Sequence, residues 1–262
     1  MDLQNKVAVV TGGAQGLGKA FVEILLKKGS NVAFIDVNEP LGKELKAALA
    51  EEYGADRVEF YVADVSSKEE FTGVFQKIVD KFGHIDIMYN NAGVVNENDW
   101  EKTIAINMVG LVRGTYLALK YMKNNPDRKG AIINISSTAG LWFVPTAPIY
   151  TATKYAVVGF SRAIAAVAMN SNLELRINIL CPGMVKTNLL SSNNIEDHFG
   201  QFSHIAGLKD MVLERNSFVT ADDVAEASLI LLTDESKNGE ILKIDSHGIE
   251  FISLPEPSAM RK

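Results

Sequence analysis

The feature that most constrains the fold is an alternation of two kinds of segment along the chain. Seven short runs of β-branched and other apolar residues are separated by longer segments with helical spacing of their apolar residues. The runs span residues 7–10, 31–35, 58–62, 85–89, 131–135, 176–180 and 241–244. Continuous apolar runs are typical of parallel strands buried on both faces, and the segments between them supply the helical crossovers. The pattern predicts an α/β fold, a doubly wound parallel sheet of about seven strands with helices on both faces.

The organisation of the chain favours one domain over residues 1–262. No Pro/Ser-rich linker or low-complexity tract divides it. Residues 188–217 are polar and irregular, with weak helical character around 204–213, and they follow the sixth run. Because ligands of open α/β sheets bind beyond the carboxyl ends of the strands, we expect this segment to be a substrate lid. The tail from residue 254 contains two prolines and is expected to fray.

The composition excludes several classes of function. The formal net charge of −6 argues against non-specific nucleic-acid binding. A single cysteine, Cys181, rules out an internal disulfide and a cysteine-based zinc cluster, and it favours a reducing compartment. The four histidines show no shared metal-ligand spacing, and no run of about 18 apolar residues could span a membrane. Since the N-terminus does not resemble a signal peptide, we expect a cytoplasmic protein without a metal site.

A glycine-rich turn lies between the first apolar run and the first helical segment. The turn comprises Gly12, Gly13, Ala14, Gln15, Gly16, Leu17 and Gly18. Glycines let the backbone approach a phosphate, and a helix N-terminus offers free N–H groups and the positive end of its dipole. A turn between a strand and a helix therefore predicts a dinucleotide site, and a simple tight turn is the alternative.

Other polar or small residues end the neighbouring runs. Asp36 could accept both hydroxyls of an adenosine ribose, and no basic residue follows at Val37 to neutralise the extra phosphate of NADP, so we predict NAD. The alternative for Asp36 is a helix cap or a solvated acid. The third run leads into Ala63, Asp64 and Val65, and the fourth into Asn91, Ala92 and Gly93. Asp64 could accept from an adenine amino group or could cap the next helix.

Tyr150 and Lys154 form the candidate catalytic pair, because residues four apart share one face of a helix. A nearby ammonium stabilises a phenolate, so the expected effect is a lowered pKa of Tyr150 and a general base for an alcohol proton. Spacing alone does not distinguish this pair from chance. Ser137 lies where a loop could bring it beside the phenol, whereas Ser136 should point away and be structural. Asn107, within a helical segment, either satisfies backbone groups or holds a water that links Lys154 to solvent.

Taken together, these motifs resemble the classical short-chain dehydrogenase/reductase family. The matching segments run in the family's order from residue 11 to residue 187 and also include Pro182 and Gly183. The resemblance implies a Rossmann-type sheet with strand order 3-2-1-4-5-6-7. It also implies Tyr150 as base, Lys154 as its assistant, Ser137 as the orienting residue and Asn107 in a water relay. The stretch that would contact the nicotinamide end of NAD continues through Val185, Lys186 and Thr187.

Within the family, residues 11–16, 98–103 and 114–119 resemble NAD-dependent members that oxidise hydroxylated lipids. The implied activity is oxidation of a secondary alcohol on an apolar substrate, a hydroxy fatty acid or a prostaglandin-like lipid, with Ser137, Ala147 and Tyr150 at the substrate. Those members carry a substrate-contacting glutamine where this chain has Ala147, and Trp142 and Phe143 are expected to make the same wall bulkier and more apolar.

Several alternatives share part of this pattern. The first is a steroid, retinoid or other alcohol or carbonyl oxidoreductase of the same family, including an NADPH-dependent carbonyl reductase. An epimerase or dehydratase with the same Tyr/Lys pair would need an added domain for which the chain has no room. A silent NAD-sensing protein would tend to lose the Tyr or the Lys, and both are present.

Two long helices are expected at about residues 100–123 and 150–169. The second is apolar almost all round, which indicates burial on more than one side. The resemblance implies a homodimer or homotetramer formed through these helices.

Overall fold

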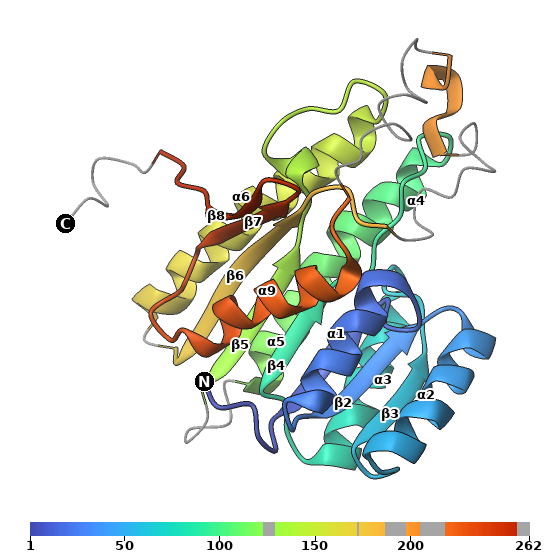
Figure 1. Ribbon diagram of the computed structural model, residues 1–262, viewed down its shortest axis with the longest axis vertical. Coiled ribbons are helices and arrows are strands. Elements are labelled where there is room, and N and C mark those ends of the chain that lie inside the picture. Colours follow the sequence, from blue (N-terminus) through green and yellow to red (C-terminus); the bar gives the residue numbers. More distant parts are fainter. Residues whose placement is uncertain (123–128, 172, 187–197, 205–217, 256–262) are drawn as a thin grey trace.

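The computed structural model describes residues 1–122, 129–171, 173–186, 198–204 and 218–255 (Figure 1). Within them one sheet has the strand order β3-β2-β1-β4-β5-β6-β7-β8. The strands are β1 (Val7–Thr11), β2 (Asn31–Asp36), β3 (Val58–Val62), β4 (Ile87–Asn90), β5 (Gly130–Ile135), β6 (Leu175–Pro182), β7 (Ile241–Asp245) and β8 (Gly248–Phe251). The first seven pair in parallel. The predicted fold class and the order of these seven strands are therefore confirmed.

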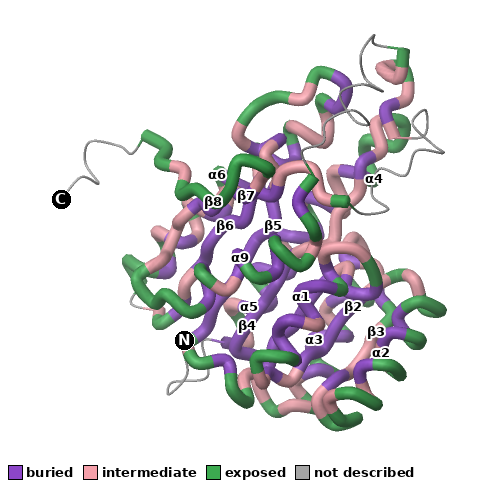
Figure 2. Tube along the Cα trace, viewed as in Figure 1, coloured by how far each residue is buried: buried purple, intermediate pink, exposed green. Residues whose placement is uncertain are grey.

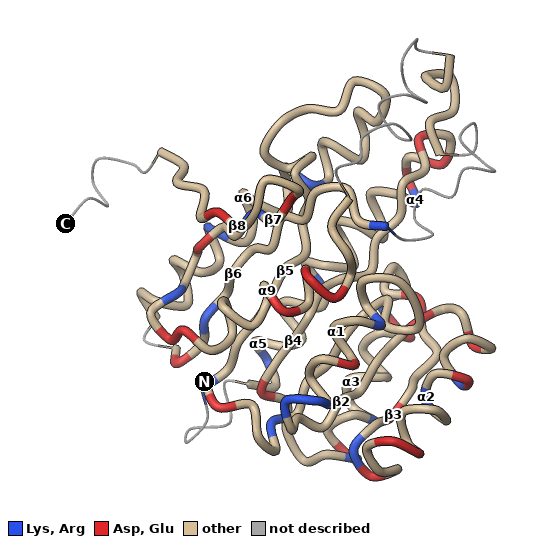
Figure 3. The backbone as a smooth tube through the Cα atoms, viewed as in Figure 1, with Lys and Arg blue, Asp and Glu red and all other residues tan. Residues whose placement is uncertain are grey.

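Helices cover both faces of the sheet, whose central strands are buried (Figure 2). Each face has its own apolar core. On one face lie α1 (Gly16–Lys27), α2 (Glu39–Tyr53) and α9 (Ala221–Thr233), which contribute Phe21, Leu49 and Leu231 to the core. On the other lie α3 (Lys68–Phe82), α5 (Leu111–Met122) and α6 (Pro148–Asn170), which contribute Phe71 and Leu117. The charged side chains are concentrated on the outer helices and loops, whereas the central strands are almost free of them (Figure 3).

The eighth strand is a correction to the predicted count. β8 pairs antiparallel with β7 through a tight turn in which the Asp245 carboxylate accepts from His247 N at 2.9 Å and Gly248 has a φ of +114°. All four residues of β8 are exposed. β8 is therefore not a buried apolar run, and the pattern that predicts the other strands does not extend to it.

The expected helix over 100–123 has an irregular middle. It consists of α4 (Trp100–Ile104), a π-helical stretch η1 (Ala105–Gly110) and α5, and residue 123 lies outside the described residues. Such wide turns often occur at functional sites. Here the wide turn contains Asn107 and passes close to the end of β3, where a Cβ on Gly110 would stand 2.7 Å from Val65 Cγ2.

Two further predictions concern the helix expected at 150–169 and the segment that follows β6. The helix expected at 150–169 begins two residues earlier, with Pro148 in its first turn, where proline has no N–H to lose. The helical character expected at 204–213 falls almost wholly on residues outside those described, and only 198–204 of the predicted lid can be described. No helix within the described ranges is long and apolar enough to cross a membrane.

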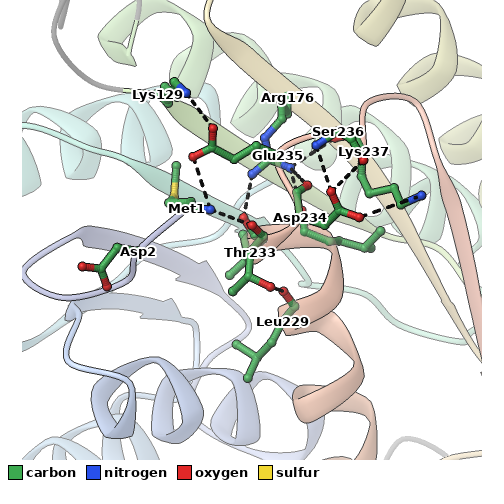
Figure 4. Close-up of polar contacts among 12 residues, drawn as sticks. Met1, Asp2, Lys129, Arg176, Leu229, Thr233, Asp234, Glu235, Ser236 and Lys237 are labelled. Carbon is green, nitrogen blue, oxygen red and sulfur yellow. Dashed lines mark hydrogen bonds and ion pairs between the residues drawn. The ribbon is translucent and has the colours of Figure 1, made fainter.

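At the amino-terminal edge of the sheet, Arg176 of β6 binds the C-terminus of α9 (Figure 4). Its guanidinium donates to the carbonyl oxygens of Leu231, Leu232, Asp234 and Lys237 at 2.7–3.1 Å. Leu231 and Leu232 lie in the last turn of α9, whose carbonyls have no intrahelical donors, and Asp234 and Lys237 lie in the turn that follows. One side chain therefore satisfies several carbonyls and joins α9 to the sheet.

We expect Arg176→Met to lower the free energy of unfolding by about 2–3 kcal/mol, because it strips the charged donors from these partly buried carbonyls. Urea denaturation with an unchanged m-value measures the effect. Lys129→Met is the matched control, since Lys129 makes an exposed ion pair with Glu235 in the same region and should change stability by less than about 1 kcal/mol. Equal effects of the two substitutions would contradict this role for Arg176.

Candidate active site

The glycine-rich turn between β1 and α1 has the backbone geometry that the sequence predicted. Gly12 and Gly16 adopt φ values of +64° and +55°, in the left-handed region that favours glycine. A Cβ on Gly18 would overlap the carbonyl oxygen of Gly12, so only glycine fits where the helix meets the turn. Helices α2, α3 and α9 are capped by the side chains of Asn38, Ser67 and Thr220.

By contrast, the N-terminus of α1 begins after Gln15 with no side-chain cap and no acidic residue in its first turn. Its first amides therefore keep their donors for an anion, with the positive end of the helix dipole behind them. The glycine cradle and the uncapped helix fit the pyrophosphate of a dinucleotide.

Asn91, at the end of β4, holds this turn against the sheet. Its Nδ2 donates to the carbonyl oxygens of Thr11 and Gly12 at 2.9 and 3.2 Å. In return Thr11 Oγ1 accepts from the backbone amides of Asn91 and Ala92 at 3.0 and 3.1 Å. Thr11 was not predicted to have a role, although a polar residue ending an otherwise apolar strand could have indicated one. The predicted phosphate and ring-binding segments are thus one hydrogen-bonded unit.

Asp36 ends β2 beside the same turn. Its carboxylate accepts from Ala14 N at 3.0 Å and from Asn38 N at 2.9 Å. The alternative of a helix cap is wrong, because the cap of α2 is Asn38, whose side chain accepts from Leu41 N. The next residue, Val37, is 65% exposed. Each carboxylate oxygen has more than one acceptor position, so Asp36 can orient the turn and still accept from a ribose hydroxyl.

Asp64, after β3, is likewise not a helix cap. Its Oδ1 accepts from Ser66 N and Ser66 Oγ at 2.8 and 2.7 Å, and the cap of α3 is Ser67. Asp64 N donates to Glu70 at 3.0 Å. The carboxylate is therefore fixed by its own turn at the carboxyl edge of the sheet, on the same side as Asp36.

Tyr150, Ser137 and Lys154 meet where β5 ends beside α6. Ser137 hydrogen-bonds Tyr150 through its side chain, and Lys154 Nζ lies 5.5 Å from the centre of the Tyr150 ring. Lys154 is only 4% exposed and donates from Nζ to Ile135 O at 3.1 Å. Ser136 points the other way and donates to Lys154 O at 2.9 Å, which makes it structural as predicted. The structure thus brings the three predicted catalytic side chains together.

The ionisation of this pair differs from the prediction. Burial raises the pKa of Tyr150 to about 12, although its hydrogen bond with Ser137 acts in the opposite direction. Burial also lowers the pKa of Lys154 to about 8. The expected lowering of the tyrosine pKa is wrong in this structure because removal from water disfavours both charged forms.

Asn107 lies within η1 and is buried. Its Oδ1 accepts from Val94 N at 2.8 Å, and its Nδ2 donates to Val94 O at 2.9 Å and to Thr153 Oγ1 at 3.2 Å. A Cβ on Gly93 would stand 3.4 Å from Asn107 Oδ1 and 3.6 Å from Lys154 Nζ, so the amide and the ammonium approach the same small residue. The side chain satisfies backbone groups, and the water relay stays a prediction.

The end of β6 supplies the remaining predicted nucleotide contacts. Gly183 N donates to Ile244 O at 2.7 Å, and Val185 forms a bridge with Val219. Lys186 is exposed, and Thr187 lies outside the described residues. Just before them Cys181 is fully buried among Val158, Ile179 and Ile241, and burial raises the pKa of its thiol to about 12. It packs as a small apolar residue, as its position predicts.

An apolar wall adjoins the Tyr150 ring. Ala147, Val95 and Phe199 form a small buried cluster. The partly buried side chains packed against it are Val144, Tyr150 and Met184. Phe199 belongs to the predicted lid. No apolar pattern in residues 188–217 had indicated Phe199 as a site residue. Trp142 and Phe143 do not belong to this cluster; they are 47% and 75% exposed, and Lys243 lies over the Trp142 ring.

The described residues hold no group of three His, Cys, Asp or Glu side chains that could bind a metal ion. What they assemble along the carboxyl edge of the sheet is a cradle for a dinucleotide, a buried Tyr–Ser–Lys group and an apolar wall next to the phenol. A phenol beside a hydroxyl donor can hold and exchange a proton with an alcohol oxygen.

Comparison with known proteins agrees with this chemistry. The family model described as short chain dehydrogenase matches residues 6–198. The 15-hydroxyprostaglandin dehydrogenase (NAD(+)) of Homo sapiens is 43% identical over 254 residues, covering 96% of this chain and 95% of that protein. The 3beta-hydroxysteroid dehydrogenase 2 of Eggerthella lenta is 32% identical over 254 residues, covering 93% and 94%. The crystal structure of levodione reductase aligns with a TM-score of 0.80 at 26% identity, covering 93% and 97%.

We expect Lys154→Met to raise the free energy of unfolding at neutral pH by about 1–3 kcal/mol, because it removes a buried charge. In the folded chain the pKa of Lys154 is about 8, below its ordinary 10.5. Between those values the unfolded chain binds the extra proton, so the wild type gains stability as pH rises and the advantage of the variant shrinks.

Urea titrations near neutral pH and within that alkaline window measure this difference. Lys43→Met, at an exposed position on α2, is the control and should change stability by less than about 1 kcal/mol. A Lys154→Met protein that is less stable than the wild type at both pH values would contradict the expectation.

Proposed function

The chain belongs to the short-chain dehydrogenase family, and we propose that it oxidises the secondary alcohol of an apolar hydroxylated lipid, a hydroxy fatty acid or a prostaglandin-like molecule, to a ketone. The predicted family and the predicted use of NAD are confirmed, and NAD-dependent oxidation of a secondary alcohol follows from them. The observation that supports the lipid substrate is the buried apolar cluster of Ala147, Val95 and Phe199 against the Tyr150 ring.

The residues that would hold NAD lie along the carboxyl edge of the sheet. The turn from Gly12 to Gly18 and the first amides of α1 suit the pyrophosphate, and Asp36 suits the adenosine ribose. Asp64, with Ala63 and Val65, is proposed for the adenine end. For the nicotinamide end we propose the small residues Ala92 and Gly93 after Asn91, together with Pro182, Gly183, Val185, Lys186 and Thr187. When bound, NAD supplies the positively charged ring that accepts the hydride.

In the proposed reaction the phenolate of Tyr150, stabilised by the positive charge of Lys154 and of bound NAD, takes the proton of the substrate hydroxyl. Ser137 donates a hydrogen bond to the substrate oxygen and orients it against the phenol. Lys154 supplies positive charge near the Tyr150 ring, and its contact with Ile135 O fixes the position of that charge. Asn107 holds residue 94 beside α6, and the proposed route for the proton to solvent passes from Lys154 along this region. Exclusion of water by the apolar cluster strengthens each of these polar interactions.

A hydroxysteroid is the second candidate substrate. The observation that favours it is the 32% identity with a protein named 3beta-hydroxysteroid dehydrogenase 2. Both substrates are apolar secondary alcohols, and Ala147 offers neither of them a polar side chain. The higher identity, 43%, with a 15-hydroxyprostaglandin dehydrogenase makes the hydroxy lipid the first choice.

We further propose that residues 1–262 form one dehydrogenase domain with 188–217 as its substrate lid. The contact of Phe199 with the apolar cluster supports the lid. A homodimer is proposed through the outer faces of α5 and α6, where Tyr116 and Tyr155 are about half exposed and the rings of Tyr116 and Phe160 join the two helices. Light scattering of the purified protein measures the state, with a homotetramer as the alternative. A cytoplasmic location stays a prediction.

The test of the proposed function is turnover of a panel of hydroxy fatty acids, prostaglandins, hydroxysteroids and retinol with NAD, in the wild type and in Tyr150→Phe. We expect ketone formation from a hydroxy lipid and a decrease in kcat of about 10²–10⁴-fold in the variant, which keeps the ring and loses the proton-transfer group. NAD affinity, measured by calorimetry, should be retained. Near-normal turnover by Tyr150→Phe would exclude Tyr150 as the base, and inactivity of the wild type toward every hydroxy lipid would exclude the proposed substrate.

A second prediction concerns the coenzyme. Asp36→Ala combined with Val37→Arg should reverse the preference from NAD to NADP, because it removes the ribose acceptor and its charge and places a cation at the exposed position next to it. The ratio of kcat/KM for the two coenzymes is the measurement. Asp36→Asn is the control, since its amide oxygen can still accept from Ala14 N while the charge is gone, and it should weaken the preference without reversing it. An unchanged ratio in the double variant would show that Asp36 does not select the coenzyme.

A further inference from the structure

Glu97 binds the N-terminus of α6, the catalytic helix that carries Tyr150 and Lys154, and it comes from outside that helix. The residue preceding α6 is Ala147, which has no side chain that could cap it, and Pro148 has no N–H. The first two amides that need an acceptor are those of Ile149 and Tyr150. Both donate to the Glu97 carboxylate, at 3.1 and 2.9 Å, so a segment about fifty residues away supplies the missing cap.

The contact is made with the backbone of the tyrosine that the proposed mechanism uses. A Tyr side chain has only two rotatable bonds between its backbone and its ring, so fixing the backbone amide restricts where the hydroxyl can lie. The first intrahelical bond of α6, from Thr151 N to Ala147 O at 2.9 Å, comes after these two amides. Without Glu97, Tyr150 would therefore sit in an uncapped first turn, the part of a helix that frays most readily.

Glu97 also contacts the segment that carries the apolar wall. Glu97 N donates to His198 O at 2.9 Å, and His198 Nδ1 lies 2.9 Å from Val95 O. The next residue, Phe199, packs in the cluster that includes Val95 and touches the Tyr150 ring. Glu97 thus contacts the described part of the proposed lid through its backbone and the catalytic helix through its side chain.

We propose that Glu97 is a positioning residue for the reaction: it holds Tyr150 in place and links that position to residues 198–200 on the substrate side. The inference rests on the proposed function for its kinetic consequences, and its structural consequences are independent of any substrate. It assigns to Glu97 no contact with the reacting atoms.

The test compares Glu97→Ala with Glu97→Gln. In Glu97→Ala, hydrogen exchange of the NAD-free protein should be faster at the amides of residues 149–150 and in the peptide covering 198–204. The kcat for alcohol oxidation should fall about tenfold or more, since small misplacements of a reacting group have effects of this size, while the KM for NAD should stay within about twofold. Glu97→Gln keeps one acceptor oxygen and the length of the side chain, so it should recover part of both losses.

Ser67→Ala is the matched control, because it also removes a side-chain cap, that of α3, but lies away from Tyr150. It should lower thermal stability to a similar extent with kcat unchanged. The inference is overturned if exchange at residues 149–150 is unchanged in Glu97→Ala, or if its kcat equals that of Ser67→Ala. A wild type that oxidises no alcohol in the panel would refute the proposed function instead, and the exchange experiment would still decide whether Glu97 holds the helix.

Discussion

The site depends on how closely α6 is held against the end of β5. Ser136 Oγ donates to Lys154 O, and Lys154 Nζ donates back to Ile135 O, so strand and helix are joined in both directions at one point. Gly140 allows this approach, because a Cβ there would stand 2.6 Å from Lys154 O. The same contact places an ammonium where water is largely excluded, and the free energy of desolvation is offset only in part by the hydrogen bond to Ile135. The packing of the fold, together with the hydrogen bond to Ile135 O, therefore keeps Lys154 in place against the free energy of its desolvation.

The chemistry of the pair follows from this desolvation. A buried phenol and a buried ammonium both favour their neutral forms, which explains why the pKa of Tyr150 rises while that of Lys154 falls. A site in this condition holds a proton on the tyrosine and responds strongly to any added charge, because electrostatic interactions are larger where water is excluded. Functional sites of this kind reduce stability locally, and the rest of the fold compensates. Here the compensation comes from two large cores and from contacts such as that of Arg176 with the end of α9.

Much of this arrangement could be predicted from the sequence. The parts that could not be predicted have one physical reason in common. Strands β1 to β7 are short apolar runs, mostly buried except for the edge strand β3, and the turn from Gly12 to Gly18 has a local spacing that indicates its conformation, so both were predictable. β8 is exposed, and its pairing depends on the free edge of β7, which no local pattern reveals. The role of Asn107 was left open between water and backbone, because the choice depends on which residue lies opposite, and that residue is Val94.

Glu97 and Phe199 were missed for the same reason, since each acts on a segment far away in the sequence. Ala147 provides an indirect indication for Glu97. A helix that starts with alanine and proline, and contains a residue that must be placed accurately, needs an acceptor from elsewhere. The segment that begins at Asn91 is positioned to supply this acceptor. Asn91 holds its start against the glycine turn, and Asn107 holds Val94 near α6. The same short connection, residues 91–98, therefore contacts the nucleotide turn at one end and the catalytic helix at the other. A substitution in this connection should be judged by what it does to both ends, because no other described segment contacts α6 and the glycine turn through side-chain hydrogen bonds.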